Sequence, residues 1–196
     1  MTGLPASAGT ELLRECIRRV VAAEERLGQG WIQIREKDLQ GGALVELARF
    51  AVQEASAASV RVLINDRLDV ALAANAAGVH LGEQSLPVEI VAQWRRSAGR
   101  PDFMIGVSTH SLEAARAAER EGADYIFFGP VFATPSKAEY GPPQGIERLR
   151  EVCAAVAIPG LAIGGVSYEN TGACLEAGAA GVAAIRWFQS VGTLAP

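Results

Sequence analysis

Short apolar runs alternate with amphipathic stretches along most of the chain. The apolar runs predict strands at residues 31–35, 60–65, 78–81, 103–107, 125–129, 160–164 and 181–185. These runs hardly alternate between apolar and polar residues, which is typical of strands buried on both faces of a parallel sheet. The stretches between them have the apolar spacing of helices. The pattern therefore predicts an α/β protein in which each strand is followed by a helix.

The helical stretches have recognisable ends, and the strand–helix unit repeats. The helix predicted at 111–120 opens with Ser111 and stops at Gly122, which suits a C-terminal cap. A helix end, a tight turn and a new strand recur in similar form at 75–80, 121–126 and 176–182. Two architectures fit this alternation, an open doubly wound sheet and a closed eight-stranded barrel. Periodicity alone does not separate them.

The N-terminal region departs from a complete barrel. The first clear element, at residues 11–26, is a predicted helix with no strand before it. In a barrel, the first strand would then be missing or reduced to residues 1–6. An absent strand would expose hydrogen-bonding edges on both of its neighbours. We expect a single domain that spans residues 1–196.

Composition excludes several classes of protein. With 196 residues, 49% hydrophobic and 20% charged, the chain can bury a core and fold on its own. Its longest apolar stretch, 156–166, is broken by Pro and Gly well short of the roughly 18 residues of a membrane span. No secretory signal is visible, which favours the cytoplasm. A net charge of −4 argues against a general nucleic-acid binder.

The three cysteines, Cys16, Cys153 and Cys174, lie far apart and have no C-x-x-C spacing. Their odd number fits neither a set of disulfides nor a zinc cluster. We therefore expect all three to be small buried hydrophobic residues.

Polar residues follow the predicted strands at their carboxyl ends, where parallel α/β folds bind ligands. Cationic side chains there suit phosphate oxygens, and carboxylates suit a divalent ion that bridges phosphates. The cations are Arg35, Lys37, Lys137 and Arg186, and the carboxylates are Asp66 and Glu83. The sequence thus predicts a site for a phosphorylated small molecule.

Two loops add to this prediction. The long loop 130–145 carries Thr134, Ser136 and Lys137, whose hydroxyls and ammonium would clamp a pyrophosphate when the loop closes. At Gly164 and Gly165, the missing side chains would let backbone N–H groups approach an anion beside the start of the next helix.

Each of these signals also has a simpler interpretation. The charged run 35–38 could be a solvated turn, 65–67 an Asx turn that caps the next helix, and 130–145 a surface excursion. His110 suits a general acid or base, or else a solvent-exposed histidine at a helix start. His80 lies within a predicted strand, where a structural role is favoured.

Several short motifs follow one another in a fixed order. They are Q-I-R-E-K-D-L at 33–39, L-I-N-D-R at 63–67, G-V-H-L-G at 78–82, G-V-S-T-H at 106–110, F-G-P-V-F-A-T-P-S-K at 128–137 and A-I-G-G at 162–165. In this order they resemble the motifs of the thiamine phosphate synthase and thiazole tautomerase family. The resemblance runs from residue 31 to about residue 186.

The resemblance implies a TIM (β/α)₈ barrel and an enzyme of thiamine biosynthesis. The synthase of this family joins hydroxymethylpyrimidine pyrophosphate to thiazole phosphate with Mg²⁺ and releases pyrophosphate. By the resemblance, the pyrimidine is contacted by Gln33 and Ser108, and magnesium is bound by Asp66. The residues implied to contact the pyrophosphate are Arg35, Lys37, Asn65 and Lys137. Those implied to contact the thiazole phosphate are Thr134, Ser136, Gly164 and Gly165. The implied partners are these phosphorylated small molecules, with no nucleic acid and no membrane. A homo-oligomer is compatible with the resemblance.

Two residues depart from the synthase motifs. Ser85 stands where the family carries a second metal-binding aspartate, so the adjacent Glu83 becomes the other candidate metal ligand and Mg²⁺ dependence is an open question. Arg186 stands in place of a small serine beside the thiazole phosphate, where it would either bind the phosphate or fill the site. Three functions therefore stay open: a thiamine phosphate synthase, a thiazole tautomerase with His110 as acid and base, and a non-catalytic ligand-binding regulatory barrel of the thiamine pathway.

Overall fold

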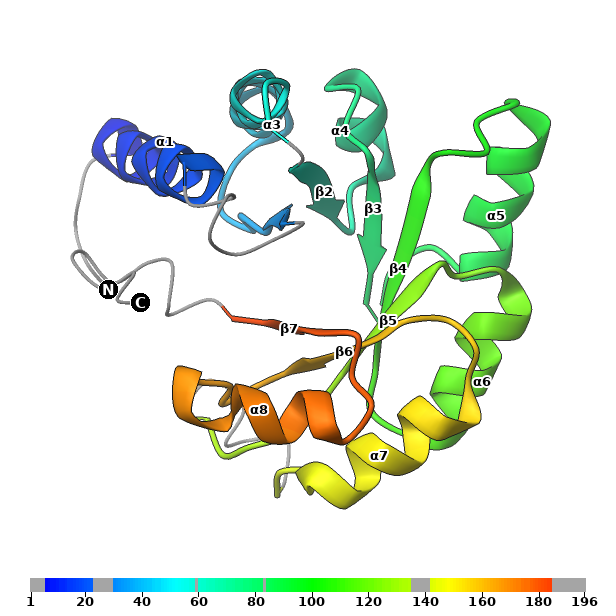
Figure 1. Cartoon of the computed structure of the whole chain (residues 1–196). Coiled ribbons are helices and arrows are strands. Elements are labelled where there is room, and N and C mark those ends of the chain that lie inside the picture. The colour runs from blue at the N-terminus through cyan, green and yellow to red at the C-terminus, as the bar shows by residue number, and fades with distance from the viewer. Residues whose placement is uncertain (1–5, 23–29, 59, 83, 135–141, 185–196) are drawn as a thin grey trace. The chain divides into compact units, whose positions relative to one another are not determined.

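The structure, a computed structural model, describes residues 6–22, 30–58, 60–82, 84–134 and 142–184 (Figure 1). Its seven strands form one sheet in sequence order, and the pairs β1–β2, β4–β5, β5–β6 and β6–β7 are parallel. The strands are β1 Trp31–Ile34, β2 Arg61–Asn65, β3 Gly78–Leu81, β4 Met104–Thr109, β5 Tyr125–Phe128, β6 Gly160–Ile163 and β7 Gly181–Ala183. All seven predicted strands are confirmed, with ends shifted by at most two residues.

Helices follow the strands in regular alternation. They are α1 Ala6–Ala22, α3 Gly41–Ala55, α4 Leu68–Ala73, α5 Val88–Ser97, α6 Leu112–Glu121, α7 Gly145–Ala155 and α8 Tyr168–Glu176. A doubly wound sheet reverses its strand order at a switch point, whereas a barrel adds each strand beside the previous one. The uninterrupted order β1 to β7 is therefore that of the predicted (β/α)₈ barrel, and it removes the ambiguity left by periodicity.

The N-terminal expectation also holds within the described residues. The predicted first helix is α1, which begins at Ala6, earlier than expected, and no strand precedes β1 in the described part of the chain. Residues 1–5 lie outside the described residues. The chain divides into two compact units, with the boundary between Val79 and His80, so the expectation of a single domain stays a prediction.

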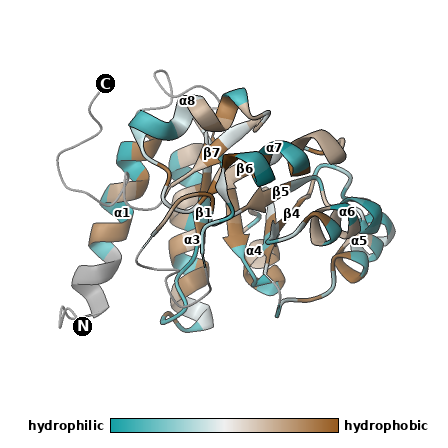
Figure 2. Ribbon diagram, turned by 90° about the horizontal axis from the view of Figure 1, so that it is seen from below, coloured by the Kyte–Doolittle hydropathy of each residue, from teal (hydrophilic) through white to brown (hydrophobic). Residues whose placement is uncertain are grey.

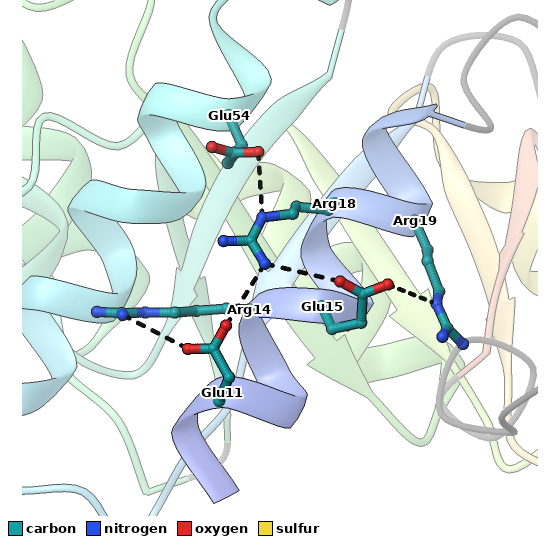
Figure 3. A network of polar contacts seen from close by, with 6 residues as sticks. All are labelled: Glu11, Arg14, Glu15, Arg18, Arg19 and Glu54. Atoms are coloured by element: carbon teal, nitrogen blue, oxygen red, sulfur yellow. Dashed lines mark hydrogen bonds and ion pairs between the residues drawn. The ribbon is translucent and has the colours of Figure 1, made fainter. Parts of the chain in front are cut away.

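In the first unit, α1 packs against α3 through charged side chains (Figure 3). Arg18 is paired with Glu11, Glu15 and Glu54, and its guanidinium lies 5.1 Å from the centre of the Phe50 ring. Exposed ion pairs of this kind contribute at most about 1 kcal/mol each. Apart from these charged contacts, one face of α3 is apolar and buried, at Leu44, Leu47, Ala48, Ala51 and Ala55.

In the second unit, β4 and β5 form a buried centre covered by helices (Figure 2). The predicted caps of α6 are confirmed: Ser111 Oγ accepts a hydrogen bond from the Ala114 N–H at 3.1 Å, and Gly122 has φ +102°. Because side chains alternate along a strand, Gly106 and Ser108 share one face of β4, while Ile105 lies on the other. This alternation decides which residues of the two strands can meet.

Two expectations from composition can be compared with the structure. Within the described residues, no helix is long and apolar enough to cross a membrane. The expectation that all three cysteines are buried is right for Cys174 and wrong for Cys16 and Cys153, which are half-buried.

Candidate active site

At the ends of β1 and β2, two amide side chains meet. Gln33 Nε2 donates a hydrogen bond of 2.9 Å to Asn65 Oδ1 on the neighbouring strand. The other end of the Gln33 amide, Oε1, is buried and accepts no hydrogen bond from any described residue. A buried acceptor without a donor costs roughly 1–3 kcal/mol. Such an atom is a marker for a ligand that brings an N–H or O–H group.

The residues that follow Asn65 form a tight turn. The Arg67 N–H donates to the Asn65 carbonyl at 2.8 Å, and Asp66 between them has φ +68°, which is unusual for a residue with a side chain. The N-cap of α4 is Arg67, and no side chain caps this helix. The interpretation of this segment as a capping Asx turn is therefore wrong. The turn instead exposes the Asp66 carboxylate beyond the end of β2.

The charged run after β1 presents its cations to the outside. Arg35 and Lys37 are exposed, whereas Glu36 between them is half-buried. Burial, with a further contribution from Asp38, raises the pKa of the Glu36 carboxyl, and Arg35 opposes this shift. The run thus differs from a uniformly solvated turn, because Glu36 is half-buried while Arg35, Lys37 and Asp38 are exposed.

Ser108, near the end of β4, is linked to a buried histidine. The His80 ring is 1% exposed, with Nε2 2.8 Å from Ser108 Oγ and Nδ1 3.0 Å from the Tyr125 hydroxyl. The ring also lies against Phe127, with 4.3 Å between ring centres. His80 lies within β3, as predicted, and the structural role favoured for it stays a prediction. Its contact with Ser108 was not apparent from sequence, because 28 residues separate the two.

His110 follows β4 and is half-buried. Its Nδ1 is hydrogen-bonded to the carbonyl oxygen of Gly129. A carbonyl only accepts hydrogen bonds, so the proton of the neutral ring is on Nδ1, and Nε2 carries the lone pair. The interpretation of His110 as a solvent-exposed histidine is therefore wrong.

The Gly164–Gly165 turn after β6 is held against the segment that follows β5. Gly164 and Gly165 have φ +89° and +67°. The carbonyls of Ile163 and Gly164 accept the N–H groups of Val131 and Phe132, both at 2.9 Å. These two hydrogen bonds hold the turn in place through its carbonyl groups.

The start of α8 completes this turn. Asn170 Nδ2 donates to the Gly165 carbonyl at 3.0 Å, while Asn170 Oδ1 accepts the Ser167 N–H at 2.8 Å. A helix N-terminus carries partial positive charge and attracts anions. Asn170 is not among the residues predicted for the site, although its position three residues after Ser167 is the spacing of a capping box.

Some of the predicted site residues cannot be placed. Glu83, Ser136, Lys137 and Arg186 lie outside the described residues. Thr134 is half-buried and directly precedes the segment that carries Ser136 and Lys137. The Ser85 side chain makes a local hydrogen bond, in which its Oγ accepts the Gly82 N–H at 2.6 Å.

The sequential strand order defines the fold class, a (β/α)₈-barrel protein, in which the carboxyl ends of the strands are the usual place of ligand binding. A family model described as "Thiamine monophosphate synthase" matches residues 6–188, and the chain belongs to this family. The resemblance drawn from the motifs is thereby confirmed.

Individual relatives agree with the family model. The chain is 45% identical over 168 residues to the thiamine-phosphate synthase of Anaeromyxobacter dehalogenans, covering 85% of this chain and 73% of the relative. It is 42% identical over 166 residues to that of Roseiflexus castenholzii, covering 85% and 71%. Among solved structures, thiamine phosphate pyrophosphorylase from Pyrococcus furiosus matches with a TM-score of 0.77 and 32% identity, covering 93% of this chain and 82% of that one. The fold class is thus confirmed as well.

Proposed function

We propose that this chain is a thiamine-phosphate synthase, which joins hydroxymethylpyrimidine pyrophosphate to thiazole phosphate and releases pyrophosphate. The observation that carries the proposal is the unmatched Gln33 Oε1, held in place by Asn65. An aminopyrimidine has an exocyclic amine that would supply the missing N–H donor. The Gln33–Asn65 pair is therefore suited to select this heterocycle over one without an amine.

The reaction proposed is a dissociative substitution. The bond between the pyrimidine methylene carbon and the pyrophosphate oxygen breaks first, pyrophosphate leaves with the bonding electrons, and the thiazole nitrogen lone pair then attacks the pyrimidine cation. The protein has to hold the leaving charge and align the two partners. We assign the leaving group to Arg35, Lys37, Asn65 and Lys137.

Magnesium fits the carboxylate that the turn after β2 exposes. Mg²⁺ is usually bound by one or two carboxylates together with substrate phosphates and water. Asp66 would supply one such carboxylate, with Glu83 as the second candidate. Within the described residues, no group of three or more potential metal ligands occurs, so the diphosphate itself would complete the coordination. When bound, the ion neutralises charge on the departing pyrophosphate.

The thiazole phosphate is assigned to the turn after β6. Gly164 and Gly165, with the start of α8, would bind phosphate oxygens through backbone N–H groups. Thr134, Ser136 and Arg186 would add side-chain contacts. We also expect a cytoplasmic enzyme whose partners are these small molecules. The cytoplasmic location and a homo-oligomeric state both stay predictions.

The test is to mix the protein with both substrates and Mg²⁺ and to measure pyrophosphate release. We expect release with the unaltered chain, and a fall of about tenfold or more in kcat/KM for Gln33→Leu, which keeps the size of the side chain but has no acceptor. Glu46→Gln, an exposed change on α3, serves as the control and should leave kcat/KM unchanged. Absence of pyrophosphate release would refute the proposal.

A second candidate function is thiazole tautomerisation, and the His110 contact favours it. With Nδ1 bonded to the Gly129 carbonyl, Nε2 is the nitrogen suited to move a proton. Isomerisation of the thiazole phosphate carboxylate that is lost in His110→Gln, with no pyrophosphate release, would support this function. Binding of thiazole phosphate without turnover in either assay would favour the regulatory barrel.

A further inference from the structure

The contact between His80 and Ser108 is unusual because it joins a fully buried imidazole to a half-buried hydroxyl near the end of β4. Among the described residues, the buried polar side chains are His80 and Thr109, and the buried Tyr125 ring adds a hydroxyl. Thr109 satisfies its hydroxyl in the common way, by donating to a backbone carbonyl, that of Phe127, at 3.2 Å. His80 instead lies between two hydroxyl groups, one of which belongs to a predicted substrate contact.

The strand register creates the room for this arrangement. Gly106 is paired with Tyr125, and Ser108 with Phe127, so the four residues lie on the same face of the sheet. A Cβ atom on Gly106 would lie 2.0 Å from Cζ of Tyr125. Only glycine at this position lets the Tyr125 ring cross β4 and bring its hydroxyl to His80.

The direction of the hydrogen bonds follows from the acidity of the two hydroxyls. A phenol is more acidic than an aliphatic alcohol, and its oxygen is the weaker acceptor, so Tyr125 is the donor and His80 Nδ1 the acceptor. Burial raises the pKa of Tyr125, which keeps this proton in place. A neutral imidazole has one N–H group, which is then on Nε2 and points at Ser108 Oγ.

We propose that His80 is a positioning residue that makes Ser108 a hydrogen-bond donor to the substrate. Because Ser108 Oγ accepts from His80 Nε2, its own proton is directed away from His80. This inference rests on the proposed synthase function. It implies that Ser108 donates a hydrogen bond to an acceptor atom of the substrate, a ring nitrogen of the pyrimidine.

The direct test is the tautomer of His80, measured by ¹⁵N NMR of the imidazole rings of the unaltered protein. The chain has two histidines, so the spectrum of His110→Gln assigns both. We expect the Nε2–H tautomer for His80. The Nδ1–H tautomer, or averaging between the two, would overturn the proposal. This measurement needs no catalytic turnover. A wrong tautomer would therefore refute the role of His80 separately from the synthase proposal, which is tested by pyrophosphate release.

The kinetic test is Tyr125→Phe, which retains the ring and removes the donor to His80 Nδ1. We expect part of His80 to change to the Nδ1–H tautomer and KM for the pyrimidine substrate to rise about tenfold, with KM for thiazole phosphate changed by less than twofold. Thr109→Val is the matched control, because it removes the other buried hydroxyl on the opposite face of β4. An unchanged tautomer and unchanged KM in Tyr125→Phe would contradict the proposal.

A second pair of variants separates positioning from packing. In His80→Gln the amide nitrogen can still reach Ser108, whereas in His80→Asn the side chain is too short. We expect the Gln variant to retain a several-fold lower KM for the pyrimidine substrate than the Asn variant. Equal KM values in two variants that both fold, as judged by urea denaturation, would mean that His80 serves packing alone.

Discussion

Gly164 and Gly165 show how closely single residues constrain the turn after β6. A Cβ atom on Gly164 would lie 2.5 Å from Cβ of Pro130, and one on Gly165 would lie 2.6 Å from the Ala133 carbonyl oxygen. Both residues also have positive φ, which L-amino acids with side chains rarely adopt. The Gly-Gly pair in the sequence predicted an anion-binding turn. The close packing against residues 130–133 could not be predicted, because it depends on how two loops meet.

Gly165→Ala is therefore expected to disturb the turn more than the helix that follows. The new side chain has to move the 132–133 backbone, so KM for thiazole phosphate should rise at least tenfold and stability should fall by more than about 1 kcal/mol. Gly172→Ala is the control, since a Cβ atom on Gly172 within α8 meets nothing within 4 Å. That variant should gain up to about 1 kcal/mol from helix propensity with KM unchanged. Steady-state kinetics and urea denaturation measure both, and a similar KM in the two variants would contradict the assignment.

At the scale of elements, local signals predicted the ends of helices and strands better than their contacts. Ser111 and Gly122 mark α6 in the sequence as they do in the structure, because a cap depends on residues only a few positions away. The hydrogen bonds between Gln33 and Asn65 and between His80 and Ser108 depend on strand register. A shift of one residue would turn either partner to the other face of the sheet, and no short-range pattern encodes that choice.

Arg95 on α5 joins the segments that lead into β4 and β5. Its guanidinium donates to the carbonyls of Phe103 and Gly122 and to Asp124 Oδ2, which also accepts the Ile105 N–H. Arg95→Leu leaves these acceptors without their donor, so we expect a loss of roughly 2–3 kcal/mol in the free energy of unfolding. These contacts lie at the amino ends of the strands, where barrels place stability and not catalysis, so KM should not change.

Urea denaturation of Arg95→Leu and of Arg150→Leu gives the comparison. Arg150 makes an exposed pair with Glu147, three residues away on α7, and its loss should cause no resolvable change. Equal effects of the two substitutions would show that Arg95 acts as an ordinary surface charge.

At the scale of the molecule, strand order connects sequence to function. The sequence predicted all seven strands, and the order β1 to β7 then identified a barrel, which periodicity could not. The residues proposed for the site follow different strands in the sequence, so no single segment of the chain carries all of them. The motifs were informative only as an ordered set, because a charged turn or a Gly-Gly pair alone is common on protein surfaces.

Binding of inorganic pyrophosphate with Mg²⁺ tests whether the carboxyl ends of the strands carry the diphosphate site. A ligand at 100 times its Kd stabilises the folded protein by about 2.7 kcal/mol, which for a chain of this length raises Tm by roughly 5 °C or more. We expect this shift in the unaltered protein, a much smaller one in Arg35→Ala, and a reduced effect of Mg²⁺ in Asp66→Asn. Arg61→Ala is the matched control, because Arg61 begins β2 and so carries the same charge at the amino end of a strand. If Arg61→Ala reduced the rise in Tm as much as Arg35→Ala, the stabilisation by pyrophosphate would reflect the overall charge of the protein. The diphosphate would then have to be assigned to another site.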